Sequence, residues 1–303
     1  MSIVQLCGSN FPNTGNAGCT DKSERGVERS IFLTTKSFQF DTYADFADAS
    51  VWETGIKAGE IFPIQDVDSF EIQDEDVEKY QSDLGTEALT RYGNYRRLFN
   101  FNKNTCSMKA LQGFSQQSVR VFYGDINGNI RAYSPDGTIV KGFDVDLIAV
   151  LKQTTIEAGG NVAMIPISIG EKNSRQWNTQ GVLVNPTWEA SDLVGLTDVV
   201  IEVVGTPTAL ELIVKVYSAC GYTAAGAVKE IAIKGIDPVD IVVTKTSDSS
   251  VQTVAFTDNA DGTYTGVGTA IESGDVDLKT PANQASTGLL IKSLGAATFT
   301  IPE

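Results

Sequence analysis

The sequence contains no histidine, and this absence removes several kinds of functional site at once. Ser-His-Asp and Cys-His catalysis, zinc sites with histidine ligands and histidine pH switches all require the imidazole group. Carboxylate, lysine and tyrosine chemistry stays possible, but the commonest general base is missing. We therefore expect a structural or binding protein without catalytic residues, metal or cofactor, rather than an enzyme.

Cysteine is scarce, with four residues in a chain of 303. Four cysteines are too few for a disulfide scaffold, and no C-x-x-C pair is present. A zinc site built from four such distant cysteines departs from normal ligand spacing. Cys7 and Cys19 could form one bridge near the N-terminus, and buried free thiols are the alternative.

Long apolar runs are also missing, so the sequence predicts no membrane-spanning helix and no membrane partner. The first ten residues lack a basic region and a long apolar region, so we expect no secretory signal peptide. The chain carries 23 basic and 38 acidic residues, a formal charge of −15. Such a chain should repel nucleic acid unless basic residues are segregated, and we expect no specific nucleic-acid binding.

The length and the residue pattern predict an all-β protein with two domains and an N-terminal arm. Residues 1–30 are dense in Gly, Asn, Ser and Thr, which favours an irregular arm. Residues 31–194 are expected to form a β-sandwich or barrel that begins with the strand Ile31–Phe40. Thr105–Gly113 is the one short helix that we expect there.

Turn signals place further strands within this first domain. Asn127-Gly128 predicts a tight hairpin between Val119–Tyr123 and Ile130–Tyr133. Strands are also expected over Asp144–Thr155 and Val162–Ile169, so that the region forms a β-meander with short turns.

The apolar pattern changes near Gly195. From Val199 onward, apolar residues alternate with other residues in several short runs separated by turn residues. Short strands at this spacing, without a helical stretch, predict a β-sandwich over residues 195–303.

Charge is distributed unevenly within the first domain. Residues 41–87 hold fourteen acidic and two basic residues, a net charge of −12, and we expect them to form an acidic loop. The basic segment that follows, Arg91–Lys109, carries five basic residues and no acid. We expect the acidic segment of one copy to meet the basic segment of another, since opposite patches set orientation and register. The residues chosen for this assembly interface are Arg91, Arg96, Arg97, Lys103, Asp74, Glu75, Asp76 and Glu78.

Two other interpretations of the charged segments stay open. Both segments could be solvated faces with no partner. The basic segment is also interleaved with Tyr92, Tyr95, Phe99 and Phe101, and aromatic residues among cations can bind single-stranded nucleic acid. The short span and the total charge weigh against that second interpretation.

Two kinds of carboxylate site need consideration. Asp258-Asn259-Ala260-Asp261-Gly262 is similar to the start of a calcium loop, but the downstream bidentate acid is missing, so a solvated turn is favoured. Paired carboxylates for glycoside cleavage could meet in space, although the sequence singles out no pair.

The segment Asp258–Thr265 (DNADGTYT) resembles a hairpin of bacterial immunoglobulin-like domains of the invasin type. The preceding segment Ile236–Val243 resembles the strand entry of the same domains. The resemblance covers about the last hundred residues, and it implies an immunoglobulin-like sandwich in which Tyr264 packs across the core. It implies little about function.

The whole arrangement, an arm, an acidic loop, a short helix, a β-meander and a C-terminal immunoglobulin-like domain, resembles tail-tube proteins of tailed bacteriophages. The resemblance implies a homo-oligomer of stacked rings in the virion, made in the bacterial host cytoplasm, with an acidic lumen that conducts DNA. It also implies other virion proteins as partners. A capsid or head-decoration protein is the alternative within this class. A cell-surface adhesin or carbohydrate-binding module is the alternative outside it.

Overall fold

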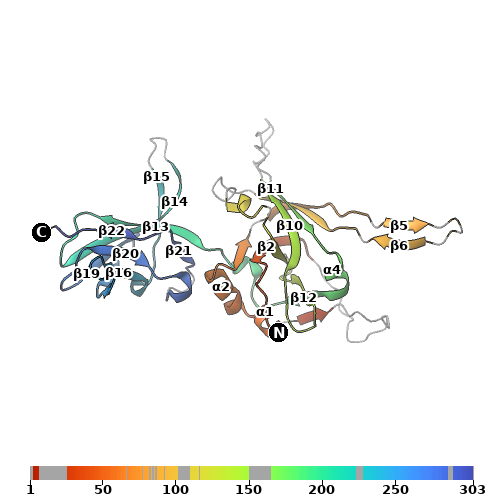
Figure 1. Cartoon of the computed structure of the whole chain (residues 1–303), viewed down its shortest axis with the longest axis horizontal. Coiled ribbons are helices and arrows are strands. Elements are labelled where there is room, and N and C mark those ends of the chain that lie inside the picture. The colour runs from red at the N-terminus through yellow and green to blue at the C-terminus, as the bar shows by residue number, and fades with distance from the viewer. Residues whose placement is uncertain are drawn as a thin grey trace. The chain divides into compact units, whose positions relative to one another are not determined.

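The computed structural model describes residues 3–6, 26–65, 67–76, 78–81, 83, 85, 87–91, 93–101, 110–115, 117–149, 165–222, 228–285 and 289–302. Backbone packing divides the chain into two compact units, Met1–Val194 and Gly195–Glu303. Strands dominate both units (Figure 1), which confirms the all-β fold class.

The first unit is built on one ten-stranded sheet. Its strands are β1 (Ile3–Leu6), β2 (Glu28–Thr35), β3 (Ile61–Ile64), β4 (Val67–Ile72), β7 (Arg96–Phe101), β8 (Val119–Asp125), β9 (Ile130–Tyr133), β10 (Phe143–Ala149), β11 (Ile165–Glu171) and β12 (Gly181–Asn185). β2 pairs with β8, then β10, β11, β7 and β4 follow in order. β3 leads directly into β4 and pairs back with β2, so the succession of neighbours returns to its start and the strands form a barrel.

The interior of this barrel is apolar and largely aromatic. Residues at alternate positions of the strands point inward, because successive side chains of a strand lie on opposite faces. The interior includes Ile31 and Leu33 of β2, Val121 and Tyr123 of β8, and Phe99 and Phe101 of β7. Each of these six side chains is at most 1% exposed.

Two helices cover the outer face of β2 and β8. They are α1 (Tyr43–Ala47), capped by Thr42, and α2 (Ala49–Lys57), capped by Asp48. Phe46 and Trp52 from these helices pack against Phe32 and Phe122, the outward residues of the two strands. The prediction that residues 41–87 form a loop is therefore wrong, because residues 43–57 form two helices that pack on the barrel and residues 61–64, 67–72 and 78–81 form strands.

Other expectations for the first unit have mixed outcomes. The predicted hairpin joins β8 to β9, but only Gly128 has a positive φ, of 78°, and Asp125 Oδ1 accepts the N–H groups of Asn127 and Asn129. Residues 110–112 are helical, whereas residues 105–109 of the predicted helix lie outside the described residues. A further helix, α4 (Arg175–Gln180), was not expected.

The predicted arm is in part a set of strands. β1 pairs with β12, and Glu28 to Ser30 belong to β2. Residues 7–25, with Cys7 and Cys19, lie outside the described residues, as do residues 150–164, which include parts of two expected strands.

The second unit is a β-sandwich. One sheet contains β13 (Thr197–Val204), β14 (Glu211–Tyr222), β15 (Val228–Ala232), β18 (Ala255–Asp258), β19 (Thr263–Val267) and β21 (Ile291–Ser293). The other contains β16 (Ile241–Lys245), β17 (Val251–Gln252), β20 (Gly274–Leu278) and β22 (Ala297–Phe299). The inner faces share one apolar core that includes Val214, Val243 and Val276. Only single 3₁₀ turns interrupt the strands in the described part of this unit.

Tyr264 of β19 lies in this core, as the resemblance to immunoglobulin-like domains implies. Its side chain is 0% exposed. Its hydroxyl donates to the carbonyl oxygen of Ile233 at 3.1 Å and accepts the N–H of Ile236 at 3.2 Å. The ring therefore fills the core while its hydroxyl fixes the segment that crosses between the two sheets.

Candidate functional site

A long two-stranded ribbon carries most of the residues chosen for the assembly interface. It consists of β5 (Glu78–Gln81), β6 (Glu87–Arg91) and the residues 73–76 and 93–95 that join them to β4 and β7. Figure 1 shows the ribbon extending away from the barrel. It is the continuation of the β4–β7 pair, since Gln73 donates to the carbonyl oxygen of Arg96 and Glu75 to that of Asn94.

One arm of the ribbon belongs to the acidic segment, and the other runs from the last acid of that segment, Glu87, into the basic segment. Glu78 stands opposite Arg91 in the strand register, and Lys79 forms an exposed ion pair with Glu87 at 3.3 Å. Opposite charges therefore face each other across the ribbon of one chain, while the expected contact between the segments of different copies stays a prediction. Pairs of this kind, between exposed side chains, contribute little to stability.

Two further acids of the predicted interface, Asp74 and Glu75, form hydrogen bonds at the foot of the ribbon, where it joins β4 and β7. Asp74 Oδ1 accepts the N–H of Arg96 at 3.0 Å, and Glu75 Oε2 accepts the side-chain amide of Asn94 at 3.0 Å. Asp76 is exposed. Lys103 lies outside the described residues, and the side chain of Arg91 is not described.

The ribbon is exposed on both faces. Every described side chain of β5 is exposed, including Tyr80 at 60%, and Ile72, the last residue of β4 before the ribbon, is 56% exposed. β5 and β6 pair only with each other in the described part of the chain, so each has a free edge. Free edges present unpaired N–H and C=O groups to which another strand can add.

Arg97 does not lie on the surface as predicted. It is 3% exposed and points into the barrel, because it shares the strand face of Phe99 and Phe101. The adjacent Arg96 points outward and is exposed. The prediction that Arg97 contacts a neighbouring copy is therefore wrong for this fold.

Arg97 belongs to a buried ring of four charges, which we call the charge ring: Glu28, Arg97, Glu171 and Arg131. Arg97 lies 3.0 Å from Glu28 and 3.3 Å from Glu171. Arg131 lies 2.5 Å from the other oxygen of Glu28 and 3.4 Å from Glu171. The four residues come from β2, β7, β11 and β9, and each is at most 3% exposed.

Aromatic rings complete the surroundings of the charge ring. The Arg131 guanidinium lies 4.4 Å from the ring centre of Trp177 and 5.1 Å from that of Tyr123. The Arg97 guanidinium lies 5.5 Å from the ring centre of the same tyrosine, Tyr123. Cations over aromatic faces gain an electrostatic attraction that partly replaces lost hydration.

Burial is the largest single influence on the pKa values of Glu171, Tyr123 and Arg97. It raises the pKa of Glu171, although Arg131 and Arg97 oppose the change. It also raises the pKa of the Tyr123 hydroxyl well above its ordinary value. For Arg97, burial lowers the pKa, but the attraction of Glu28 and smaller contributions from Tyr123, Glu171 and Asp74 outweigh it, so that Arg97 stays charged.

These positions limit the alternative uses of the charged residues. Phe99 and Phe101 are fully buried, so they cannot stack on the bases of a nucleic acid. The two ring carboxylates are sealed in the barrel and shared with guanidinium groups, an environment unlike that of an acid–base pair open to a sugar.

The calcium-like segment forms a turn. Asp258 accepts the N–H groups of Ala260 and Gly235, and Asp261 accepts the N–H and the hydroxyl of Thr263. These bonds use both carboxylate oxygens of Asp258 and one of Asp261, as in a turn held by its own side chains. In the described part of the chain, no group of three or more acidic or cysteine side chains is placed to hold a metal ion.

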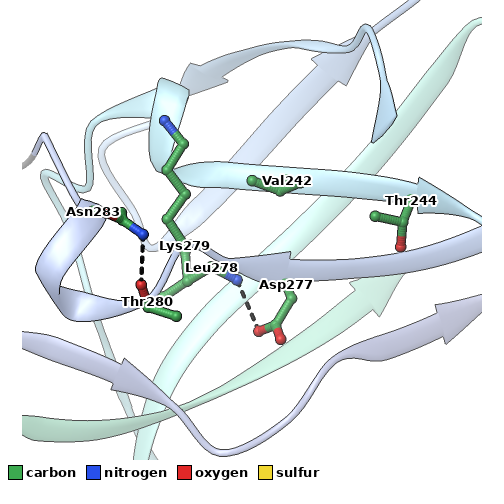
Figure 2. Close-up of a pocket in the computed structure, with 7 residues that line it drawn as sticks. All are labelled: Val242, Thr244, Asp277, Leu278, Lys279, Thr280 and Asn283. Carbon is green, nitrogen blue, oxygen red and sulfur yellow. Dashed lines mark hydrogen bonds between the residues drawn. The ribbon is translucent and has the colours of Figure 1, made fainter. Parts of the chain in front are cut away.

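A shallow hollow of about 530 Å³ lies on the second unit (Figure 2). It is lined by Val242, Thr244, Asp277, Leu278, Lys279, Thr280 and Asn283, none of which is aromatic. Figure 2 shows two of its polar groups bonded internally, Asn283 to Thr280 at 3.0 Å and Asp277 to the N–H of Leu278 at 2.8 Å. Ligand pockets are usually enclosed and largely apolar or aromatic, so this hollow is a weak binding site.

Within the described residues, no helix is long and apolar enough to cross a membrane. No protein-family model matches the chain, and a search of curated proteins finds no relative.

Proposed function

We propose that this chain is a non-enzymatic structural subunit that assembles with copies of itself, and that the assembly is the tail tube of a bacteriophage virion. The exposed ribbon is the observation that carries the first part of this proposal. The second part rests on the resemblance in domain order described above and on the acidic charge.

The ribbon supports self-assembly because its strands have neither a third strand nor a packed face in the described part of the chain. A two-stranded ribbon without a packed face is marginally stable in water, and three or more strands or a covering element are normally needed. Tyr80 stays exposed on it, Ile72 is exposed at the end of β4 where the ribbon begins, and both edges of the ribbon are free in the described part of the chain. A neighbouring copy that pairs with an edge or covers a face would supply the missing contacts.

The acidic balance suits a conduit for DNA. The whole chain carries a net charge of −15, and an acidic wall would keep a polyanion from adhering during passage. A capsid or head-decoration protein would use the same ribbon for contacts and is the alternative within the class.

Negative-stain electron microscopy of the purified full chain tests this proposal. Rings or tubes of uniform diameter are the expected result. A shell-like lattice would favour the capsid alternative. Monodisperse single copies at every concentration would contradict self-assembly and favour a binding module such as an adhesin.

A further inference from the structure

β2 contains a β-bulge directly beside the charge ring. Its pairing with β8 advances by two residues, from Glu28 to Ser30, while β8 moves by one, from Asp125 to Gly124. Arg29 is the extra residue of this bulge, and its side chain is exposed. A bulge changes the direction in which the neighbouring side chains of its strand point. The bulge therefore decides which side chain of β2 enters the barrel at this level.

The bulge reverses the alternation of inward and outward residues along β2. Ile31 and Leu33 point into the barrel, so an unbroken alternation would turn Arg29 inward and Glu28 outward. Glu28 is instead 3% exposed, and its carboxylate lies 3.0 Å from the buried guanidinium of Arg97. The extra residue thus exchanges the places of two adjacent and oppositely charged side chains.

The place that the two residues exchange is the one opposite Asp125. Asp125 alternates in step with Tyr123 of β8, which points into the barrel, and directly opposite residues of an antiparallel pair share one face of the sheet. With the bulge, Glu28 stands opposite Asp125. Without the extra residue, the pairing would bring Arg29 to the same place.

These two registers of β2 differ in the charge that they bury. With Glu28 inside, two carboxylates balance the two arginines of the charge ring. With Arg29 inside, three guanidinium groups would share the single carboxylate of Glu171. Uncompensated buried charge is strongly destabilising. The apolar residues of β2 after the bulge keep their places in both registers, so they do not distinguish between them.

We propose that the charge ring selects the register of β2 and that the bulge at Arg29 is the means by which the strand meets this demand. Arg29 is then a positioning residue that acts through Glu28, as an extra length of backbone and not through its own side chain. What the fold requires is a carboxylate opposite Asp125, from whichever position of β2 can supply it. This inference does not depend on the proposed tail-tube function.

An exchange of the two charged residues tests the selection of register. Glu28→Arg combined with Arg29→Glu keeps the composition and net charge of the chain. A regular β2 then places the carboxylate of position 29 opposite Asp125, and nuclear Overhauser contacts between β2 and β8 should show this loss of the bulge. The unfolding equilibrium constant in urea should stay within about tenfold of the wild type, whereas Glu28→Arg alone should raise it by about a hundredfold or more.

Tryptophan fluorescence follows the first unit in this experiment, because all three tryptophans, Trp52, Trp177 and Trp188, belong to it. An exchange variant that is as unstable as Glu28→Arg, or one that keeps the bulge, would overturn the proposal.

Deletion of Arg29 supplies an independent test. It removes the extra residue but leaves Glu28 opposite Asp125, so the deleted chain should fold. Glu28→Gln should then raise the unfolding equilibrium constant by the same factor in the deleted chain as in the wild type, about a hundredfold or more, since the carboxylate lies in the charge ring in both. A deleted chain that does not fold, or one in which Glu28→Gln has little effect, would overturn the proposal.

Arg29→Ser is the matched control for the deletion. It keeps the extra residue and changes only an exposed side chain, so it should alter the unfolding equilibrium constant by no more than about twofold. A loss as large as that of Glu28→Gln would assign the effect to the Arg29 side chain and contradict a role of the backbone bulge.

Discussion

Arg96 and Arg97 are adjacent in the sequence, but one faces solvent at the foot of the ribbon and the other is buried 3.0 Å from Glu28. A strand places successive side chains on opposite faces, so the difference follows from their position in β7. It separates the two roles of the basic segment: Arg96 contributes surface charge, and Arg97 pairs with two carboxylates inside the barrel.

The two arginines should therefore differ sharply in their effect on stability. Arg97→Met leaves two buried carboxylates with only Arg131 and should destabilise the fold by about 3–5 kcal/mol, as in other buried pairs that lose one partner. Arg96→Met is the matched control and should change stability by only about 0.5 kcal/mol. Urea denaturation followed by circular dichroism measures both, and equal effects would contradict the burial of Arg97.

Glu171 should give the stability a specific pH dependence. Because the folded state raises its pKa, the folded state binds its proton more tightly than the unfolded state. Its contribution is complete below the ordinary carboxyl pKa and is lost as the pH rises through the raised value. The stability of the wild type relative to Glu171→Gln should therefore improve as the pH falls from 7.5 toward 5.

Denaturation of both proteins at several pH values within this window gives the difference directly. Subtraction removes the titration of all groups other than Glu171 and those coupled to it. If the wild type instead loses stability relative to Glu171→Gln on acidification, then attraction from the arginines, and not burial, controls the pKa of the Glu171 carboxyl.

The local patterns of the sequence were sufficient for much of the fold. The Asn127-Gly128 hairpin was predicted from a short motif, because a tight turn depends on neighbouring residues. The burial of Tyr264 was implied by the resemblance of Asp258–Thr265 to a hairpin of immunoglobulin-like domains. The ribbon was missed although Asp83-Leu84-Gly85, near the end of the acidic segment, is a turn signal in the sequence, and Gly85 has a φ of 76°. Such a turn folds the segments against each other.

The charge ring could be predicted only in part. Arg97 alternates in step with Phe99 and Phe101, and Glu171 with Ile167 and Ile169, so a period of two would have placed both inside. Their pairing with Glu28 and Arg131 could not be derived, because those partners lie on distant strands and the order of strands in a barrel is not a local property.

Tyr264 provides a test of the second unit. Tyr264→Ala should destabilise residues 195–303 by about 3–5 kcal/mol, since it removes a fully buried ring. Tyr264→Phe keeps the ring but leaves the Ile236 N–H without its acceptor, and it should cost about 1–3 kcal/mol. Thermal denaturation of the isolated unit, which we expect to fold alone, measures both. An unfolded isolated unit would contradict its independence.

The exposed apolar residues of the ribbon and of the end of β4 from which it extends should act in association rather than in folding. Ile72→Ser together with Tyr80→Ser should weaken self-association while leaving the melting temperature nearly unchanged. Ile126→Ser is the matched control, since Ile126 is 58% exposed at the turn between β8 and β9, away from the ribbon. Light scattering over a concentration series compares the three proteins, and an equal loss of association in the control would exclude a specific role of the ribbon.

The central claim, assembly through the ribbon, is tested most directly by sedimentation of a ribbon-shortened chain. Residues 76–93 would be replaced by Asn-Gly, because Glu75 and Asn94 are the last backbone pair at the foot of the ribbon. We predict that the full chain sediments as a large homo-oligomer and that the shortened chain sediments as a folded single copy. Equal oligomers from both chains, or single copies from both, would contradict the claim.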